Sequence, residues 1–333
     1  MKIAVDSMGG DHAPLEVIKG AVEAAREYGV PIALVGDQTA IEDELSKYRT
    51  ADLPLEVRHA SAVIQMDEPP AAAIRRKPDS SLVVCANLVG AKEANAMVSA
   101  GNTGAAMAVA ILKLGLITGV DRPAIAVLVP TLKGNTVLID AGANVDCSVE
   151  RLLQFAVMGN EYARTVLGIE QPRVGLLSIG EEPTKGNELT KAANAEMSKL
   201  NLNFAGNVEG KDAFLGTADV VVCDGFDGNV VLKTAEGMAE LFVACVREES
   251  SRSVISRLGA LMLRPMFRRL EARIDYAEHG GAPLLGVNGV CIICHGRSDS
   301  RAISNAIRAA AIAVENDVVA RIEAAVRERE LVA

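Results

Sequence analysis

Short apolar segments alternate with amphipathic helical patterns along most of this 333-residue chain. Such alternation predicts right-handed βαβ units, an α/β fold and a mostly parallel sheet. The apolar segments 123–131 and 135–142 are joined only by a short connection, so we expect them to form an antiparallel hairpin. The predicted strands are 2–6, 31–37, 55–60, 94–101, 123–131, 135–142, 173–180, 218–225 and 288–296, and the predicted helices are Leu15–Tyr28, Asn102–Lys113, Ser148–Leu167, Asn187–Leu200, Asn229–Arg252 and Ser298–Arg329.

The composition favours the same architecture. Half of the residues are apolar but only 3% are aromatic, so Ala, Val, Ile and Leu must build the core. This filling is usual for parallel sheets that helices cover. A chain of this length can bury a substantial core. We see no internal repeat, low-complexity segment or long linker, and we expect residues 1–333 to form a single α/β domain with a helical arm.

Charge and cysteine usage exclude several classes of protein. Lys and Arg number 34 against 43 Asp and Glu, a net charge of −9, whereas a general nucleic-acid binder needs a basic surface. Six cysteines, mostly inside apolar segments, indicate reduced cytosolic thiols. No signal peptide is visible before the first predicted strand, and the longest uncharged run, 94–112, is too polar at its centre for a lone membrane span. We expect a soluble, cytoplasmic protein.

Six predicted strands end in small polar clusters, at residues 5–12, 98–105, 139–146, 178–188, 223–229 and 293–299. The ligand crevice of an open parallel sheet lies outside the carboxyl ends of its strands. We therefore expect these loops to meet at one cleft, where helix N-termini and backbone N–H groups favour an anion. The candidate ligand-binding residues are Asp6, Gly9, Gly10, Ser99, Gly101, Asn102, Thr103, Gly104, Asn144, Gly186, Asp224, Gly225 and Gly228.

Lys185, in the stretch GEEPTKGNEL, is the strongest charged candidate. A lysine beside glycine at a strand-to-helix junction suggests a phosphate loop, but the nucleoside-triphosphate pattern G-x-x-x-x-G-K-[ST] is not met. The alternative is a surface lysine paired with Glu181 or Glu182. Asn187 and Asn229 are candidate helix N-caps, a role compatible with ligand contact. Aspartates at the strand ends can orient a neighbouring His12 or Lys185.

The segment Cys291 to His295 matches the C-x-x-C-H haem-attachment pattern. Buried strand thiols are the preferred interpretation, because side chains alternate faces along a strand and no export signal is visible. His295, at the strand end, is either a site residue or an ordinary loop residue. The chain has no G-x-G-x-x-G fingerprint, no G-x-S-x-G elbow and no zinc-like spacing of His and Cys. We expect neither a metal nor an organic cofactor.

A basic segment, 251–273, differs from the rest of the acidic chain. Between Arg247 and Arg273 the sequence contains seven arginines and three glutamates. We expect Pro265 to divide the segment into two helices. One interpretation is a helical hairpin that buries its tip against its own fold or a second subunit. The other is an arm, 240–278, that contacts a membrane or an acidic partner through Arg257, Leu258, Leu261, Met262, Leu263, Arg264, Met266, Phe267 and Arg268.

Taken together, the loops resemble those of bacterial phosphate acyltransferases. The stretches VDSMGGDHAP, SAGNTGA, IDAGANVDC, GEEPTKGNEL, GNVEGKD, CDGFDGNVVLK and GGAPLLGVNGVCIICHG occur in that family's order and spacing, from Lys2 to the final helix. This sequence departs from the usual pattern at Ser7, where alanine is usual, at Asp227, where an uncharged residue is commoner, and at Arg297 after the last motif.

The resemblance implies a Rossmann-like three-layer α/β/α fold of the isocitrate dehydrogenase and phosphotransacetylase type, working as a homodimer. It implies transfer of a long acyl chain from acyl carrier protein to inorganic phosphate, giving acyl phosphate for phospholipid synthesis. A membrane-embedded glycerol-3-phosphate acyltransferase would consume this product, and the arm would associate peripherally with the membrane. Lys185, Asn187 and Asn229 are the expected catalytic donors, with His12 or His295 as a proton shuttle.

Three alternatives remain open from the sequence. A CoA-dependent phosphotransacetylase-like enzyme would use the same pocket for a small acyl group, but no nucleotide-binding surface is recognisable. A dehydrogenase of the related fold would need a nicotinamide site. A non-enzymatic, membrane-associated scaffold of lipid synthesis would explain the arm but not the convergent loops.

Overall fold

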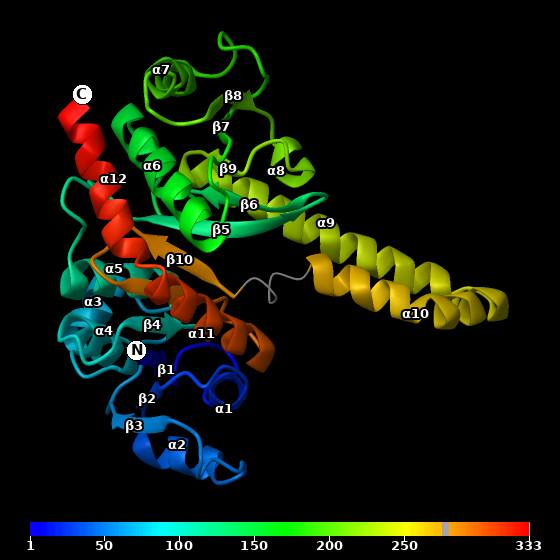
Figure 1. Cartoon of the computed structure of the whole chain (residues 1–333). Coiled ribbons are helices and arrows are strands. Elements are labelled where there is room, and N and C mark those ends of the chain that lie inside the picture. Colours follow the sequence, from blue (N-terminus) through cyan, green and yellow to red (C-terminus); the bar gives the residue numbers. More distant parts are fainter. Residues whose placement is uncertain (275–279, 333) are drawn as a thin grey trace.

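The computed structural model describes residues 1–274 and 280–332, without the side chains of residues 254, 268, 270–274 and 330–332. Within these ranges one eleven-stranded sheet has the order β3-β2-β1-β4-β11-β10-β5-β6-β9-β7-β8 (Figure 1). The strands are β1 (Ile3–Asp6), β2 (Ile32–Gly36), β3 (Leu55–His59), β4 (Ala96–Ser99), β5 (Ala124–Thr131), β6 (Gly134–Ile139), β7 (Val174–Leu177), β8 (Phe204–Val208), β9 (Val220–Val222), β10 (Ala282–Leu285) and β11 (Val290–Ile293).

Helices cover both faces of this sheet, which confirms the predicted α/β/α architecture. The helices are α1 (Leu15–Tyr28), α2 (Gln38–Leu45), α3 (Pro70–Arg76), α4 (Ser81–Gly90), α5 (Thr103–Leu114), α6 (Val149–Val166), α7 (Glu188–Met197), α8 (Asp212–Leu215), α9 (Gly225–Ser251), α10 (Val254–Ile274), α11 (Ser300–Glu315) and α12 (Val318–Val332). The core beside α1, α6, α11 and α12 receives Ile3 and Val5 of β1, while Ala4 packs toward α3, α4 and α5. Successive residues of the strand therefore pack on opposite faces of the sheet, because side chains along a strand alternate between the two faces.

The strands form two parallel groups of opposite direction. β3, β2, β1, β4 and β11 are parallel to one another, and so are β6, β9, β7 and β8. Between the groups, β11 with β10, β10 with β5, and β5 with β6 are antiparallel pairs. Three successive reversals leave the second group antiparallel to the first. The predicted β5–β6 hairpin is confirmed by this pairing.

All nine predicted strands are present, but β8 and β10 had not been predicted. β8 contains a glycine and an asparagine, and β10 is four residues long with a proline, so neither shows an apolar alternating run. The predicted helix 298–329 is two helices, α11 and α12, because Asn316 ends the first and Asp317 adopts a positive φ of 51°.

The helices α9 and α10 leave the body of the molecule as a long antiparallel pair (Figure 1). The prediction that Pro265 divides this arm was wrong, since Pro265 lies inside the continuous helix α10. The residues around it are exposed, so water can bind the carbonyl group that loses its intrahelical N–H partner. The turn lies at Arg252 and Ser253, and the Ser253 hydroxyl accepts the N–H of Ser256 at 3.0 Å.

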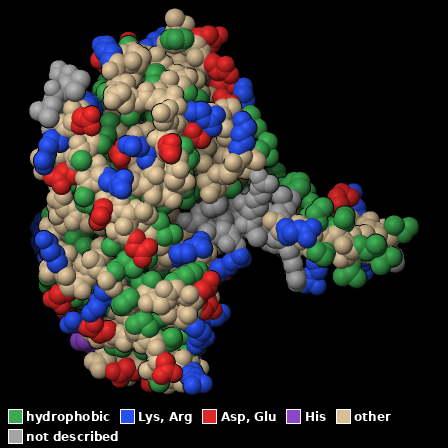
Figure 2. Space-filling model, in the orientation of Figure 1, with side chains coloured by type: hydrophobic (Ala, Val, Ile, Leu, Met, Phe, Trp, Pro, Cys, Tyr) green, Lys and Arg blue, Asp and Glu red, His purple; other side chains and the backbone are tan. Residues whose placement is uncertain are grey.

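The arm exposes many apolar side chains, and Figure 2 shows them gathered toward its outer end. Met262 is 76% exposed and Ile255 is 85% exposed. The predicted end of the arm at residue 278 lies outside the described residues, as does the side chain of Arg268. Among the described helices, none combines the length and the apolar character needed to cross a bilayer.

Close packing of α1 on α11 gives a test of the fold. A Cβ at Gly20 would overlap the Ser300 carbonyl oxygen and lie 2.7 Å from the Ile303 Cβ. We expect Gly20→Ala to lower the free energy of unfolding by about 1–3 kcal/mol, because the two helices must separate. Urea unfolding followed by circular dichroism measures this change.

The matched control is Gly237→Ala in α9, where an added Cβ meets nothing within 4 Å. This variant should gain about 0.5–1 kcal/mol from helix propensity. Equal effects of the two substitutions would contradict the packing that the structure shows.

Candidate functional site

The loops that follow β1, β4 and β11 contact one another directly. Asp11 donates its backbone N–H to the carbonyl oxygen of Gly296 at 2.8 Å, so the first loop is joined to the third. A Cβ at Gly9 would lie 2.9 Å from the backbone nitrogen of Gly101, which allows no side chain between the first loop and the second. We call these three loops the first loop group. Gly10 belongs to the first of these loops. Its φ of 110° is a backbone conformation that glycine adopts more readily than other residues.

Asp6 holds the first loop group together. The carboxylate is 2% exposed and accepts the Ser99 hydroxyl at 2.7 Å, which ties the end of β1 to the end of β4. It also accepts the backbone N–H of Met8, at 3.4 Å. Burial raises the pKa of Asp6, and its hydrogen bonds oppose that shift. This aspartate therefore faces the protein, and its contacts position the loop rather than a ligand.

Asn102 is the N-cap of α5, and its side chain is fully engaged. The Oδ1 atom accepts the N–H of Ala105 at 2.9 Å, and Nδ2 donates to the carbonyl oxygen of Met66 at 2.8 Å and to that of Glu68 at 3.2 Å. The first turn of α5 contains no acidic residue. An uncharged cap leaves the positive end of the helix dipole without a neighbouring acidic side chain in its first turn, which favours an anion there.

A second loop group follows β6 and β9, and a buried carboxylate that the sequence reasoning had not selected organises it. Asp140 is fully buried and accepts five N–H donors. They are the backbone N–H groups of Ile125 (3.0 Å), Gly142 (3.2 Å), Ala143 (3.0 Å) and Asn144 (2.7 Å), and Nδ2 of Asn144 (2.9 Å). Burial raises the pKa of Asp140 and these donors oppose the rise. The Asn144 amide is thus used within the loop.

The start of α9 packs tightly against this loop. Asp224 is its N-cap, accepting the N–H of Phe226 at 2.8 Å, and it also accepts the N–H of Cys147 at 2.7 Å. The prediction that Asn229 caps this helix was therefore wrong, because the aspartate reaches the first free N–H groups one turn earlier. A Cβ at Gly228 would overlap the Asp140 carbonyl oxygen, so this glycine allows a close approach of helix and loop.

Lys185 and Asn187 lie in the loop after β7, next to β9 in the sheet. The Asn187 side chain caps α7, accepting the N–H of Thr190 at 2.8 Å, as predicted. Lys185 is exposed, and among the described residues its ammonium forms no ion pair with Glu181 or Glu182. The loop is anchored through Asn207, whose Nδ2 donates to the Glu182 carbonyl oxygen at 2.9 Å. Lys185 is thus held on an ordered loop and available to an anion.

The prediction that all six loops leave one end of the sheet was wrong. β6, β7 and β9 run antiparallel to β1, β4 and β11, so their loops leave in the opposite strand direction. Helix α9 connects the two groups instead. The Asn229 side chain lies beside Gly142 of the second group, while the charge of Lys233 acts on His295 of the first. Asn229 and Lys233 are four residues apart and share one face of α9, about 6 Å along the axis.

His295 follows β11, and the charges of Lys233 and Glu236 on α9 act on its ring. Its Nδ1 accepts the backbone N–H of Arg297 at 3.1 Å, which leaves the proton of the neutral ring on Nε2. Burial lowers the pKa of His295, the positive charges of Lys233 and Arg297 lower it further, and Glu236 and Asp11 oppose them. The imidazole is therefore neutral near pH 7, with Nε2 as an N–H donor. His12, in the first loop group, is exposed.

Cys291 and Cys294 do not form a paired thiol site. Both are buried, but Cys291 packs in the core beside α4 and α5 while Cys294 packs in the core of the opposite layer. Burial raises the pKa of each thiol to about 12. Within the described residues no cluster of His, Cys, Asp and Glu has the arrangement that a metal ion requires.

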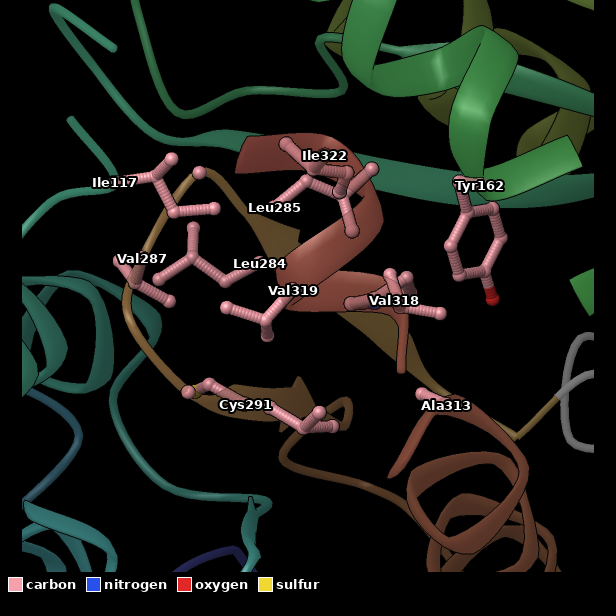
Figure 3. A pocket seen from close by; sticks show the side chains of 14 residues that line it. Ile117, Tyr162, Leu284, Leu285, Val287, Cys291, Ala313, Val318, Val319 and Ile322 are labelled. Atoms are coloured by element: carbon pink, nitrogen blue, oxygen red, sulfur yellow. The ribbon is translucent and has the colours of Figure 1, made fainter. Parts of the chain in front are cut away.

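An apolar cavity of about 20 Å³ lies in the core away from both loop groups, between β10, β11, α6 and α12. Figure 3 shows Leu284, Leu285, Val318 and Ile322 around it, with Tyr162 at one side. Burial raises the pKa of the Tyr162 hydroxyl. Space of this size holds about one water molecule, so the cavity is a packing defect and not a substrate pocket.

Comparison with known proteins identifies the family. A family model described as fatty acid synthesis protein matches residues 1–321. A phosphate acyltransferase of Pelotomaculum thermopropionicum is 53% identical over 331 residues, with 99% of this chain and 96% of the relative covered. A phosphate acyltransferase of Desulforamulus reducens is 54% identical over 323 residues, with 97% and 96% covered. The chain belongs to the phosphate acyltransferase family. It is therefore an acyltransferase, as the resemblance of its loops predicted.

The fold is shared with more distant enzymes. A phosphotransacetylase from Streptococcus pyogenes superposes with a TM-score of 0.67 at 18% identity, covering 95% of this chain and 94% of that one. EutD phosphotransacetylase from Staphylococcus aureus gives a TM-score of 0.61 at 16% identity, with 94% of each chain covered. The predicted phosphotransacetylase-like architecture is confirmed by these similarities.

The structure adds residues to the candidate site that the sequence reasoning missed. Asp140 was detectable, since an aspartate directly after a strand and before small residues is a common organiser of turns. Lys233 and Glu236 gave no such signal, because they lie mid-helix at ordinary surface spacing. Only the tertiary fold lets their charges act on His295.

The charges on α9 make the His295 environment testable. We expect Lys233→Gln to raise the pKa of His295, because a nearby positive charge that disfavours the imidazolium is removed. Glu236→Gln is the control of opposite sign and should lower the same pKa. Titration of the His295 ring resonances by NMR measures both shifts. Two shifts in the same direction would show that α9 does not act on His295 electrostatically.

Proposed function

We propose that this acyltransferase moves a long-chain fatty acyl group from acyl carrier protein to inorganic phosphate, giving acyl phosphate for phospholipid synthesis. One observation supports this best: the two loop groups offer N–H donors and are linked electrostatically and sterically by Asn229 and Lys233 of α9, while the loop after β7 carries the exposed Lys185. Membership of the phosphate acyltransferase family supports the same conclusion.

The reaction needs positioning more than it needs a base. A phosphate oxygen attacks the thioester carbonyl carbon, a tetrahedral oxyanion forms, and its collapse breaks the C–S bond. The thiolate leaves readily because a thiol has a pKa of about 8.5. Holding the two reactants in line can contribute about 7–11 kcal/mol, and each oxyanion donor about 3–4 kcal/mol. Inorganic phosphate is already an anion near pH 7, so no protein nucleophile is required.

The charges of the site suggest where the phosphate binds. The N-terminus of α9 is surrounded by Asp140, Asp224 and Asp227, which disfavour a further anion. The N-terminus of α5, at Thr103 and Gly104, has an uncharged cap and no acidic residue in its first turn. We assign phosphate binding to the α5 turn and charge neutralisation to Lys185. Because the loop after β7 leaves the sheet in the opposite strand direction, this assignment requires Lys185 to reach the phosphate from the other side of the site. Gly10 and Gly186 then serve as turn residues, both with positive φ.

The remaining donors complete the proposed mechanism. Asn229 is exposed beside Gly142, and its amide is placed to donate to an oxyanion. Asn187 is assigned an indirect role, because its Oδ1 already accepts the N–H of Thr190. It orders the N-terminus of α7, whose free N–H groups favour an anion. His295, neutral with a proton on Nε2, is assigned a hydrogen bond to the leaving thiolate, which then takes its proton from solvent. The exposed His12 is the alternative group at this step. No step requires a cofactor.

The arm is assigned the contacts with larger partners. We propose that its apolar end associates peripherally with the cytoplasmic membrane surface, where a membrane glycerol-3-phosphate acyltransferase would consume the acyl phosphate. Arg257 and Arg264 are exposed and suited to an acidic carrier protein, whereas Arg252 is paired with Glu248 and Glu249. A homodimer is the second proposed use of the apolar surface.

Lys185→Ala tests the assignment of the catalytic lysine. We expect a loss of at least about a hundredfold in turnover, because an ammonium group that stabilises the transition state contributes about 3 kcal/mol. The assay mixes the enzyme with acyl-carrier thioester and labelled phosphate, and traps acyl phosphate with hydroxylamine. Lys191→Ala, an exposed lysine on α7, is the control and should retain activity. Full turnover in Lys185→Ala would contradict this assignment. If the wild-type enzyme accepted acyl-CoA but not the acyl-carrier thioester, a phosphotransacetylase-like donor would be favoured instead.

The double variant Leu258→Ser/Met262→Ser tests the arm. The two side chains are four residues apart and are 60% and 76% exposed. We expect the fraction bound to phosphatidylglycerol vesicles to fall at least fivefold in cosedimentation, because apolar contact with the acyl region is lost. Leu112→Ser, an exposed leucine of α5, is the control on the body of the molecule. Unchanged vesicle binding together with a shift from dimer to monomer would assign this surface to self-association instead.

A further inference from the structure

An open groove lies between the start of α1 and the loop that leads from β11 into α11. Its volume is about 630 Å³. His12, Leu15 and Lys19 contribute from the α1 side, and Arg297 and Asp299 from the α11 side. The two walls come from distant parts of the sequence that Figure 1 shows packed side by side.

The acidic side chains of the groove are occupied by backbone groups. Glu16 accepts the N–H of Ser300 through Oε2 at 2.8 Å, which fastens α1 to the start of α11. Asp299 caps α11 by accepting the N–H of Ala302 at 2.9 Å. Both carboxylates are thus turned toward helix α11, where they satisfy N–H groups that a helix leaves without intrahelical partners.

The cationic side chains are available. Across the described parts of the chain, the structure records no ion pair and no side-chain hydrogen bond for Lys19 or Arg297. Lys19 is half-buried and Arg297 is exposed. The carboxylates of Glu16 and Asp299 accept backbone N–H groups, whereas the cations of Lys19 and Arg297 have no partner among the described residues. The groove is therefore suited to a ligand that carries a negative charge.

The groove opens directly onto the first loop group. His12 belongs to both, and Arg297 donates its backbone N–H to Nδ1 of His295 at 3.1 Å. Leu15, which is 46% exposed, and Ala13 give the groove an apolar portion. A ligand that fits has an anionic end at Lys19 and Arg297 and a flexible, uncharged stem that reaches the candidate site.

We propose that this groove receives the phosphopantetheine arm of the acyl carrier protein, with its phosphodiester at Lys19 and Arg297 and its thioester at the first loop group. This inference rests on the proposed function, since it concerns the delivery of that acyl donor. The phosphodiester supplies the single negative charge, and the pantetheine stem is uncharged and partly apolar. Arg297, where this sequence departs from the family pattern, becomes a determinant of donor affinity.

Charge reversal tests the groove with two donors of the same acyl chain. One is the acyl-carrier thioester, and the other is the acyl thioester of N-acetylcysteamine, which lacks the phosphate. For Lys19→Glu and Arg297→Glu we expect the ratio of kcat/KM for the first donor to that for the second to fall at least tenfold, mostly through KM. Lys113→Glu, an exposed lysine at the end of α5, is the matched control and should change the ratio less than twofold.

A binding measurement separates this inference from the proposed function. We expect 4′-phosphopantetheine to bind the wild-type protein in equilibrium dialysis and to bind Lys19→Glu at least tenfold more weakly, whether or not turnover occurs. If the protein shows this binding but forms no acyl phosphate, the assignment of the groove stands and the proposed function is wrong. The opposite result is that all variants form acyl phosphate, keep the wild-type ratio of kcat/KM for the two donors, and bind 4′-phosphopantetheine as the wild type does. That result would support the proposed function and contradict the assignment of this groove.

Discussion

Two buried carboxylates, Asp6 and Asp140, fix the loops on which the candidate site depends. Each lies at or directly after the end of a central strand, and each accepts hydrogen bonds from the loop that follows. A buried carboxylate is tolerated only when such donors compensate its desolvation. The consequence is a loop whose N–H groups are already oriented before a ligand arrives. Preorganised donors of this kind stabilise a developing negative charge without rearrangement.

These carboxylates also explain why negative side chains occur beside an expected anion site. Asp6 and Asp140 point into the protein, where backbone N–H groups and hydroxyls surround them. Asp224 is used twice, as the cap of α9 and as the acceptor of the Cys147 N–H. These acidic residues therefore build the loops, while Asn229 and Lys185 remain toward solvent. Position and burial, not residue type, separate the two roles.

Helix α9 is the element that joins the separate parts of the molecule. Its first turn packs on the Asp140 loop through Gly225 and Gly228. Its next turns carry the charges that act on His295, and its far half forms the arm with α10. The glycine-rich sequence at its start looked like a ligand loop. The structure shows instead that a Cβ at either glycine would meet Asp140. Glycine patterns alone cannot distinguish close packing from close approach to a ligand, because both require only that the Cβ be absent.

The sequence by itself determined the α/β class, nine of the eleven described strands, the β5–β6 hairpin and the cap at Asn187, because these depend on local periodicity and side-chain chemistry. Its motifs also indicated the phosphate acyltransferase family. Only the tertiary structure decided that three antiparallel pairings reverse the second loop group, that α9 links the groups, and that Lys19 and Arg297 face one groove. Strand order and helix packing are set by contacts between residues distant in the chain, and no local pattern encodes them.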